Sequence, residues 1–301
     1  MARMNTPIMG DAPDLAALLG TDTTHLRAFS SPEKLAEHVS AMGKGWHDST
    51  WDVCAERRRF TQSESMAHAI SMARNGWQAG AEQAARLRDK INASNPRGPR
   101  VVKFDVAGAR AHVPRALAGN PAHMIRNDVT QLKRRPLVAL VSDMCVSYDV
   151  PAECLINRAA TIAAVVDSIE AAGFSCRVVS AAVSQSNSVT AAVACTVKDN
   201  AAPVDIARIA YGLGHPAMFR RLCFAAWSDH TRTKPLGGGL GYIQSIKPPR
   251  DGETYLLPSA ENCCDAFRTE TMAAEHGLKF MVDTLRRQGC PAFPATDDAA
   301  A

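Results

Sequence analysis

The residues best suited to chemistry follow an unbroken apolar run at residues 137–141, within the stretch LVALVSDMCVSYDV. Polar or sulfur-bearing side chains then recur at every second position, at Asp143, Cys145, Ser147 and Asp149. Carboxylate and hydroxyl oxygens bind hard cations such as Mg²⁺, and they also accept hydrogen bonds from the backbone N–H groups that begin a helix. Two interpretations stay open: a ligand or metal site, or a capped loop before a helix that follows Pro151.

The elements around this stretch predict an α/β fold with a mixed sheet and flanking helices. The apolar run predicts a central strand that is covered on both faces, because it does not alternate with polar residues. A strand–helix–strand unit, an antiparallel hairpin, two helices and two short strands are expected in that order. They fall at residues 137–142, 152–172, 174–184, 188–199, 202–213, 216–230, 242–248 and 254–258.

The rest of the chain predicts a helical region before this core and one long helix after it. Ser31 and Pro32 have the residue types of a helix N-cap and first helical position. VVKFDVAG is expected to pair with ARAHVP as a short hairpin. We predict a flexible N-terminus, a helical region, a hairpin with its linker, an α/β core, a C-terminal helix and a disordered tail, at residues 1–30, 31–100, 101–135, 136–258, 259–290 and 291–301.

The order strand, D-x-C-x-S loop, helix, hairpin and helix resembles a von Willebrand factor A-type domain over residues 137–246. The resemblance implies a divalent metal held by Asp143, Ser147 and a downstream threonine, Thr231 or Thr233, and completed by an acidic group of a partner. Cys145 stands where the family has a serine, and a thiol is a poor ligand for Mg²⁺. We therefore expect a degenerate site with weak or absent Mg²⁺ affinity and no other cofactor.

A second resemblance covers most of residues 50–230. The segments SMARNGWQAG, FDVAGARAHVPRALAGNPAHM, NRAATIAAVVDSIEAAGFSCRV and HPAMFRRLCFA are similar to an uncharacterised family of bacteriophage and prophage proteins. The resemblance implies a viral context, in the cytoplasm of a host cell or in the virion. It implies no particular chemistry.

Composition narrows the class of protein. The 301 residues include nine cysteines without a C-x-x-C pair, which argues against a zinc site or a disulfide framework. No apolar run approaches the roughly 20 residues of a membrane span, and the first residues lack the apolar core of a signal peptide. We expect a protein of a reducing cytoplasm, without a membrane partner and with unpaired cysteines.

Further candidates lie in GLGHPAMFRR, which contains His215, Arg220 and Arg221. A histidine before proline at a helix junction is either structural or a site residue, and the two arginines belong to one of several basic clusters. Such clusters form solvated faces or contact phosphates, so nucleic acid remains a possible partner. The sequence contains no G-x-S-x-G or H-E-x-x-H motif of a hydrolase.

Together these features favour a non-catalytic binding or assembly module of a phage, which acts through the loop after residue 142 on a protein of the phage or the host. Two alternatives stay open: a metal-dependent enzyme that acts on nucleotide or nucleic acid through Asp143, and a structural component of the virion that self-associates. The binding residues expected for the first hypothesis are Cys145, Asp149, His215, Arg220 and Arg221.

Overall fold

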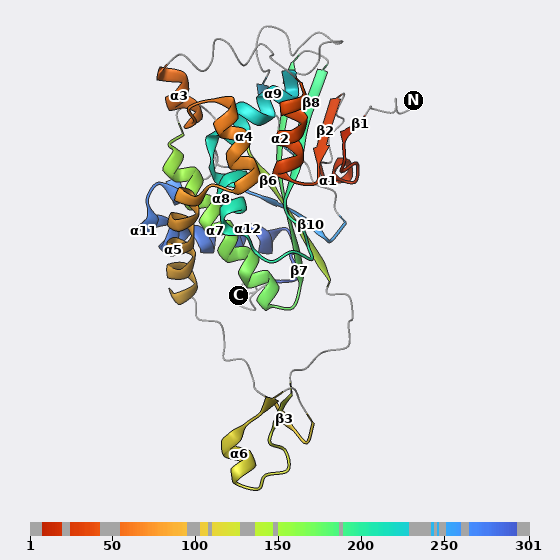
Figure 1. Ribbon diagram of the computed structural model, residues 1–301, viewed down its shortest axis with the longest axis vertical. Helices are drawn as coiled ribbons and strands as arrows, with labels where there is room; N and C mark the ends of the chain where they lie inside the picture. Colours follow the sequence, from red (N-terminus) through yellow and green to blue (C-terminus); the bar gives the residue numbers. More distant parts are fainter. Residues whose placement is uncertain are drawn as a thin grey trace, which may run out of the picture. The chain divides into compact units, whose positions relative to one another are not determined.

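The chain divides into two compact units in the computed structural model, one of residues 1–94 with 137–301 and one of residues 95–136 (Figure 1). The structure describes residues 8–19, 25–42, 55–94, 103–107, 110–126, 136–146, 150–186, 189–228, 242–243, 246, 251–259 and 265–293.

The larger unit is built on a mixed sheet. Its strands are β1 (Ile8–Gly10), β2 (His25–Phe29), β6 (Leu137–Asp143), β7 (Ser175–Ser186), β8 (Val189–Lys198), β9 (Tyr242–Ile243) and β10 (Thr254–Leu257). The order across the sheet is β1-β2-β8-β7-β6-β10, with β9 paired to β7. β7 runs antiparallel to β8 and β9, and the other neighbours run parallel. The prediction of an α/β fold with a mixed sheet is confirmed.

β6 is the central strand that the apolar run predicted. It lies between β7 and β10, and its residues from Val138 to Asp143 are buried. Val138 and Leu140 belong to the core under the helices, whereas Val141 belongs to a smaller cluster on the opposite face. Both faces are covered, as the absence of alternation requires.

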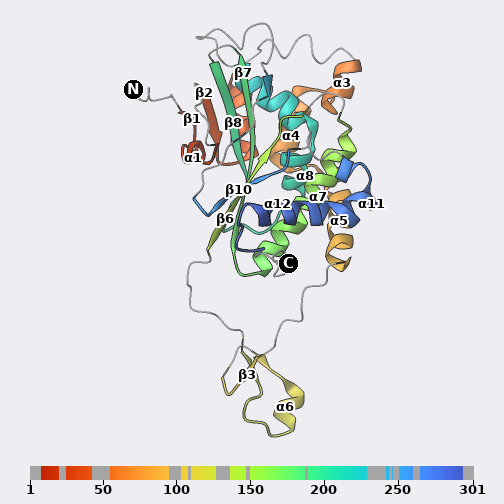
Figure 2. The ribbon, with the colours of Figure 1, turned by 180° about the vertical axis from the view of Figure 1, so that it is seen from behind.

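Most helices lie on one side of the sheet. Figure 2 shows this arrangement from the direction opposite to that of Figure 1. The central one is α7 (Ala152–Ala171), whose alanines allow α5 (Gln78–Ser94) and α8 (Ile206–Gly214) to approach closely. α7 ends before Gly173, where φ is +93°, a conformation that glycine adopts without strain. The opposite face carries the short helix α1 (Leu15–Leu19).

The remaining helices of this unit are α2 (Pro32–Ala41), α3 (Ala55–Thr61), α4 (Met66–Asn75), α9 (Phe224–Ser228), α11 (Glu270–Met272) and α12 (Leu278–Arg287). The predicted N-cap of α2 is confirmed, since Ser31 Oγ accepts a hydrogen bond from Lys34 N at 3.3 Å. Two π-helical segments, η1 (Met218–Cys223) and η2 (Ala273–Gly277), interrupt helices that the sequence predicted as continuous.

The smaller unit contains β3 (Lys103–Asp105), β4 (Arg110–Ala111), the short helix α6 (Val113–Leu117) and β5 (Met124–Arg126). The predicted hairpin is wrong in its pairing, because β5 lies between β3 and β4 and is antiparallel to both. A hydrogen bond of 2.7 Å from His112 N to His123 O closes the connection beside β4.

Two more predictions are corrected. Residues 1–30 were expected to be flexible, but β1 and β2 extend the sheet, and Leu26 to Phe29 are buried against β8. The C-terminal helix of residues 259–290 is not one element: a bend precedes Thr269, whose Oγ1 caps α11, and α12 follows η2. The expected disordered tail lies mostly outside the described residues.

Candidate functional site

The strand order reverses at β6. From β6 the chain crosses through α7 to β7 and β8 on one side, and it later returns as β10 on the other side. β7 and β10 are both parallel to β6, so the carboxyl ends of β6 and β10 lie at the same edge of the sheet. In open α/β sheets, ligands bind in the crevice that such a reversal creates. Asp143 is the last residue of β6 and therefore lies at this edge, as the sequence predicted.

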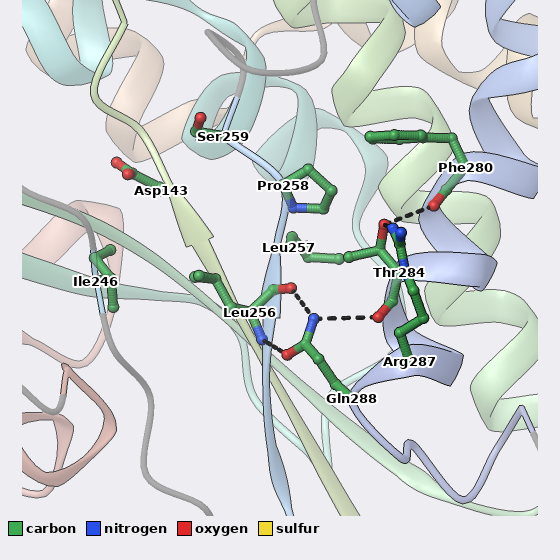
Figure 3. Close-up of a pocket in the computed structure, with 10 residues that line it drawn as sticks. All are labelled: Asp143, Ile246, Leu256, Leu257, Pro258, Ser259, Phe280, Thr284, Arg287 and Gln288. Atoms are coloured by element: carbon green, nitrogen blue, oxygen red, sulfur yellow. Dashed lines mark hydrogen bonds between the residues drawn. The ribbon is translucent and has the colours of Figure 1, made fainter.

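A cavity of about 380 Å³ occupies this position. Figure 3 shows Leu256, Leu257 and Pro258 between α12 on one side and Asp143, Ser259 and Ile246 on the other. The floor consists of Leu256, Leu257 and Pro258, so it is largely apolar. In the described lining, Asp143 is the one carboxylate and Arg287 the one cation.

The α12 wall is tied to the edge strand by Gln288. Its Oε1 accepts a hydrogen bond from Leu256 N at 2.8 Å, and its Nε2 donates to Leu256 O at 2.7 Å (Figure 3). The amide thus occupies the backbone groups that a neighbouring strand would use, which protects an edge strand from pairing with other chains. It also fixes the width of the crevice, because α12 cannot move away from β10 without breaking both bonds.

Arg287 supplies positive charge beside the apolar floor. Its Nη2 donates to Thr284 Oγ1 at 3.1 Å, and the hydroxyl in turn donates to Phe280 O at 2.8 Å. Among the described residues, the Arg287 guanidinium forms no ion pair. An anionic group that enters the crevice can therefore bind this guanidinium without displacing a carboxylate.

Arg158 holds the two strand ends together from inside the protein. Its side chain comes from α7 and is buried, with 1% exposed. The guanidinium donates to Pro258 O through Nε at 3.0 Å and Nη2 at 2.6 Å, and Nη2 also donates to Ser142 Oγ at 3.0 Å. Because the charged guanidinium donates to acceptors at the ends of both strands, it fixes the positions of these ends relative to each other.

The Asp143 carboxylate accepts a hydrogen bond from the backbone of the loop that follows β6. The side chain is 7% exposed, and its Oδ1 accepts a hydrogen bond from Cys145 N at 2.9 Å. This contact is the backbone-capping role that the sequence left open beside metal binding. Ser147, Asp149 and Thr231, the other oxygen-bearing candidates, lie outside the described residues.

Cys145 is turned into the core. Its Sγ donates to Val183 O at 3.6 Å, and burial raises the pKa of the thiol well above its usual value, with a further contribution from Asp143. A protonated thiol that faces a backbone carbonyl does not fit the ligand shell of a hard cation. No cluster of three His, Cys, Asp or Glu with the geometry of a metal site occurs within the described ranges.

His215 is a structural residue. It is 2% exposed, its Nδ1 accepts a hydrogen bond from Ala217 N at 3.0 Å, and its ring meets Trp77 edge-on at 4.5 Å. Burial lowers the pKa of His215 to about 3, so the imidazole is neutral. The ring is enclosed and its acceptor nitrogen caps the turn into the next helix, so these contacts give His215 a structural role, and its binding of a partner stays a prediction.

Arg220 and Arg221 are also internal rather than part of an exposed basic cluster, with 4% and 3% exposed. Arg221 donates to Thr61 Oγ1 at 3.2 Å and to Ser63 O at 2.8 Å. Arg220 donates to Phe60 O at 2.8 Å, and its guanidinium lies 4.2 Å from the centre of the Phe60 ring. The two side chains anchor the connection between α3 and α4, and their binding of a partner stays a prediction that these internal contacts do not support.

Sequence patterns did not indicate the residues that form the α12 wall, nor Arg158. One signal was available: Arg158 is the single basic residue within the apolar helix CLINRAATIAAVV, and such a charge requires internal acceptors. Thr284, Arg287 and Gln288 gave no comparable signal, because polar residues near the end of a helix are ordinary.

Fold and crevice define an α/β protein with a ligand-sized cavity at the reversal of strand order. The chain belongs to the family described as Domain of unknown function (DUF7192), whose model matches residues 19–291. Comparison with curated proteins and with solved structures finds no match to either. In the described part of the chain, no helix is long and apolar enough to cross a membrane.

Proposed function

We propose that the protein is a non-catalytic binding module, and that it receives a small ligand or a group of a partner protein in the crevice between β6, β10 and α12. The observation that carries this proposal is the coincidence of the cavity of about 380 Å³ with the reversal of strand order at β6. Ligand sites in proteins typically have volumes of about 300–1,000 Å³ and mostly apolar walls.

The lining favours an apolar group that carries a negative charge. Leu256, Leu257 and Phe280 offer apolar contacts, and Arg287 offers a guanidinium without an acidic partner in the described residues. General acid–base catalysis needs titratable groups that face the reacting atoms. The described lining contributes only Asp143, which already accepts a backbone hydrogen bond, so its chemistry supports binding rather than turnover.

We extend the proposal to a degenerate von Willebrand A-like core. The order of β6, α7, the antiparallel pair β7–β8 and α8 supports it, as does the position of Asp143 at the end of β6. The metal that the resemblance implies does not fit the described donors, because the Cys145 thiol faces Val183 O. In this proposal the partner contact is made without a metal, in a phage protein that acts in the host cytoplasm.

A fluorescent probe tests whether the crevice binds ligands. The probe 8-anilinonaphthalene-1-sulfonate combines apolar rings with one anionic group, and its emission rises when it leaves water. Thr284→Phe places a larger side chain in the cavity from the α12 wall. The control variant Met272→Phe adds the same side chain on α11, at a position that is 36% exposed. The proposal predicts at least tenfold weaker binding for Thr284→Phe alone. Equal affinity in the wild type and both variants would place the probe elsewhere and refute the proposal.

A further inference from the structure

The smaller unit differs sharply in charge from the rest of the protein. Residues 95–136 contain nine Lys and Arg against two Asp, a formal charge of +7. The remaining residues contain 25 basic and 28 acidic side chains, a charge of −3. The mild total of +4 therefore hides a strongly basic unit inserted between α5 and β6.

This unit also exposes apolar side chains. The side chains of this unit whose burial is described are half-buried or exposed, and three of them have large exposed fractions: Val106 with 68%, Val113 with 61% and Leu117 with 83%. Among described residues, one other large hydrophobic side chain, Met272, is exposed. Three short strands normally need an apolar face packed on something to be stable. Among the side chains of this unit that the structure describes, none is buried, so a partner that covers the exposed apolar ones would stabilise it.

The basic residues of the described part lie on or beside the small sheet. Lys103 and Arg126 are directly opposed in the register of β3 and β5, and Arg110 is opposed to Ile125 across β4 and β5. The Arg115 guanidinium lies 4.2 Å from the centre of the Phe104 ring, which joins a cation to an aromatic face.

We propose that residues 103–126 bind single-stranded nucleic acid. The partner must offer closely spaced anions to the basic residues and apolar faces to Val106, Val113 and Leu117. A single strand offers both, because its phosphates alternate with unpaired bases, whereas a duplex buries its base faces. An anionic membrane also combines the two properties, but α6 has only five residues, which is too short for a helix that lies in a membrane surface. The inference is independent of the crevice.

Fluorescence anisotropy with the full-length protein and labelled dT20 tests this inference. Four phosphate contacts predict that affinity falls about 50-fold between 50 and 200 mM salt, from a slope of roughly −0.7 for each contact. The test variant neutralises four basic residues of the unit: Lys103→Gln, Arg110→Gln, Arg115→Gln and Arg126→Gln. The control variant removes the same charge from exposed positions of the larger unit: Arg58→Gln, Arg59→Gln, Arg74→Gln and Arg268→Gln.

The test variant should bind dT20 at least 100-fold more weakly than the wild type, and the control variant within about threefold of it. Val113→Ser with Leu117→Ser, which keeps all charges, should weaken binding about tenfold. Equal losses in the test and control variants would show attraction by net charge alone and overturn the inference. Tighter binding to a 20-base-pair duplex, or to phosphatidylserine vesicles, would also overturn it in favour of that partner. Unchanged circular dichroism and an unchanged midpoint of urea denaturation would show that the larger unit of each variant is folded.

Discussion

Replacing Arg158 by methionine should destabilise the protein by about 3 kcal/mol. The hydrogen bonds of the guanidinium include two to Pro258 O and one to Ser142 Oγ, at 2.6–3.0 Å. Hydrogen bonds to a charged group contribute roughly 1.5–3 kcal/mol each, and a buried acceptor without a donor costs about 1–3 kcal/mol. Methionine is close in length and apolar, and it removes the cost of burying a charge, which offsets several kcal/mol. The net loss of stability therefore corresponds to the two acceptors that lose their donor, Pro258 O and Ser142 Oγ.

Equilibrium denaturation in urea measures this difference. Arg158→Lys keeps the charge but not the planar fork, so a single ammonium group reaches fewer acceptors and the loss should be intermediate. Arg74→Met, at an exposed position of α4, controls for the general effect of the substitution and should change stability by less than about 0.5 kcal/mol. If Arg158→Met is as stable as the wild type, the bond between the ends of β6 and β10 does not hold the crevice together, and the reasoning is refuted.

Three other expectations follow from the described geometry. Since the pKa of His215 falls from 6.5 to about 3 on folding, the unfolded chain binds a proton in this range that the folded chain does not, so stability should drop as pH falls from about 6.5 towards 3. His215→Asn, which keeps an acceptor for the backbone, should reduce this slope in urea denaturation between pH 4 and 7; an unchanged slope would assign it to other groups. Calorimetric titration of Mg²⁺ or Mn²⁺ should show no tight binding in the wild type or in Asp143→Ala, whereas tight binding in the wild type alone would establish the metal site. Burial raises the pKa of Cys145, Cys195 and Cys223, so iodoacetamide at pH 8 should modify these thiols only after denaturation, and rapid labelling of the native protein would show that they are accessible.

The core of the fold was predictable because its elements carry strong local patterns. β6 follows from an unbroken apolar run, and α7 follows from a long apolar helical pattern with a glycine after it. The β7–β8 pair follows from two β-branched runs that are separated by Gln185 to Asn187. β2 has no such pattern. It is five residues long and contains Arg27, and its burial results from pairing with β8, about 165 residues away in the sequence.

The site was predictable on one side only. Asp143 at the carboxyl end of a central strand follows from the apolar run that precedes it. The opposite wall depends on the return of β10 to the far side of β6 and on the packing of α12, and neither follows from local sequence.

The arginine pair shows a different limit. Arg220 and Arg221 look like a basic surface in the sequence, and only the tertiary structure reveals that backbone carbonyls at Phe60 and Ser63 accept their hydrogen bonds. Six of the nine cysteines lie among the described residues, where all are buried and none forms a disulfide. Cys54, Cys263 and Cys264 lie outside them, so the expectation for the whole chain stays a prediction.

The most direct measurement of the proposed binding site is a methyl NMR titration with 8-anilinonaphthalene-1-sulfonate. The rings of the probe shift nearby methyl signals, so the site is located residue by residue. If the crevice is the binding site, the signals of Ile246, Leu256 and Leu257 move together and saturate, while that of Ile70 on α4 stays in place. If these three signals remain unchanged while the probe binds, the ligand site lies elsewhere and the central claim is contradicted.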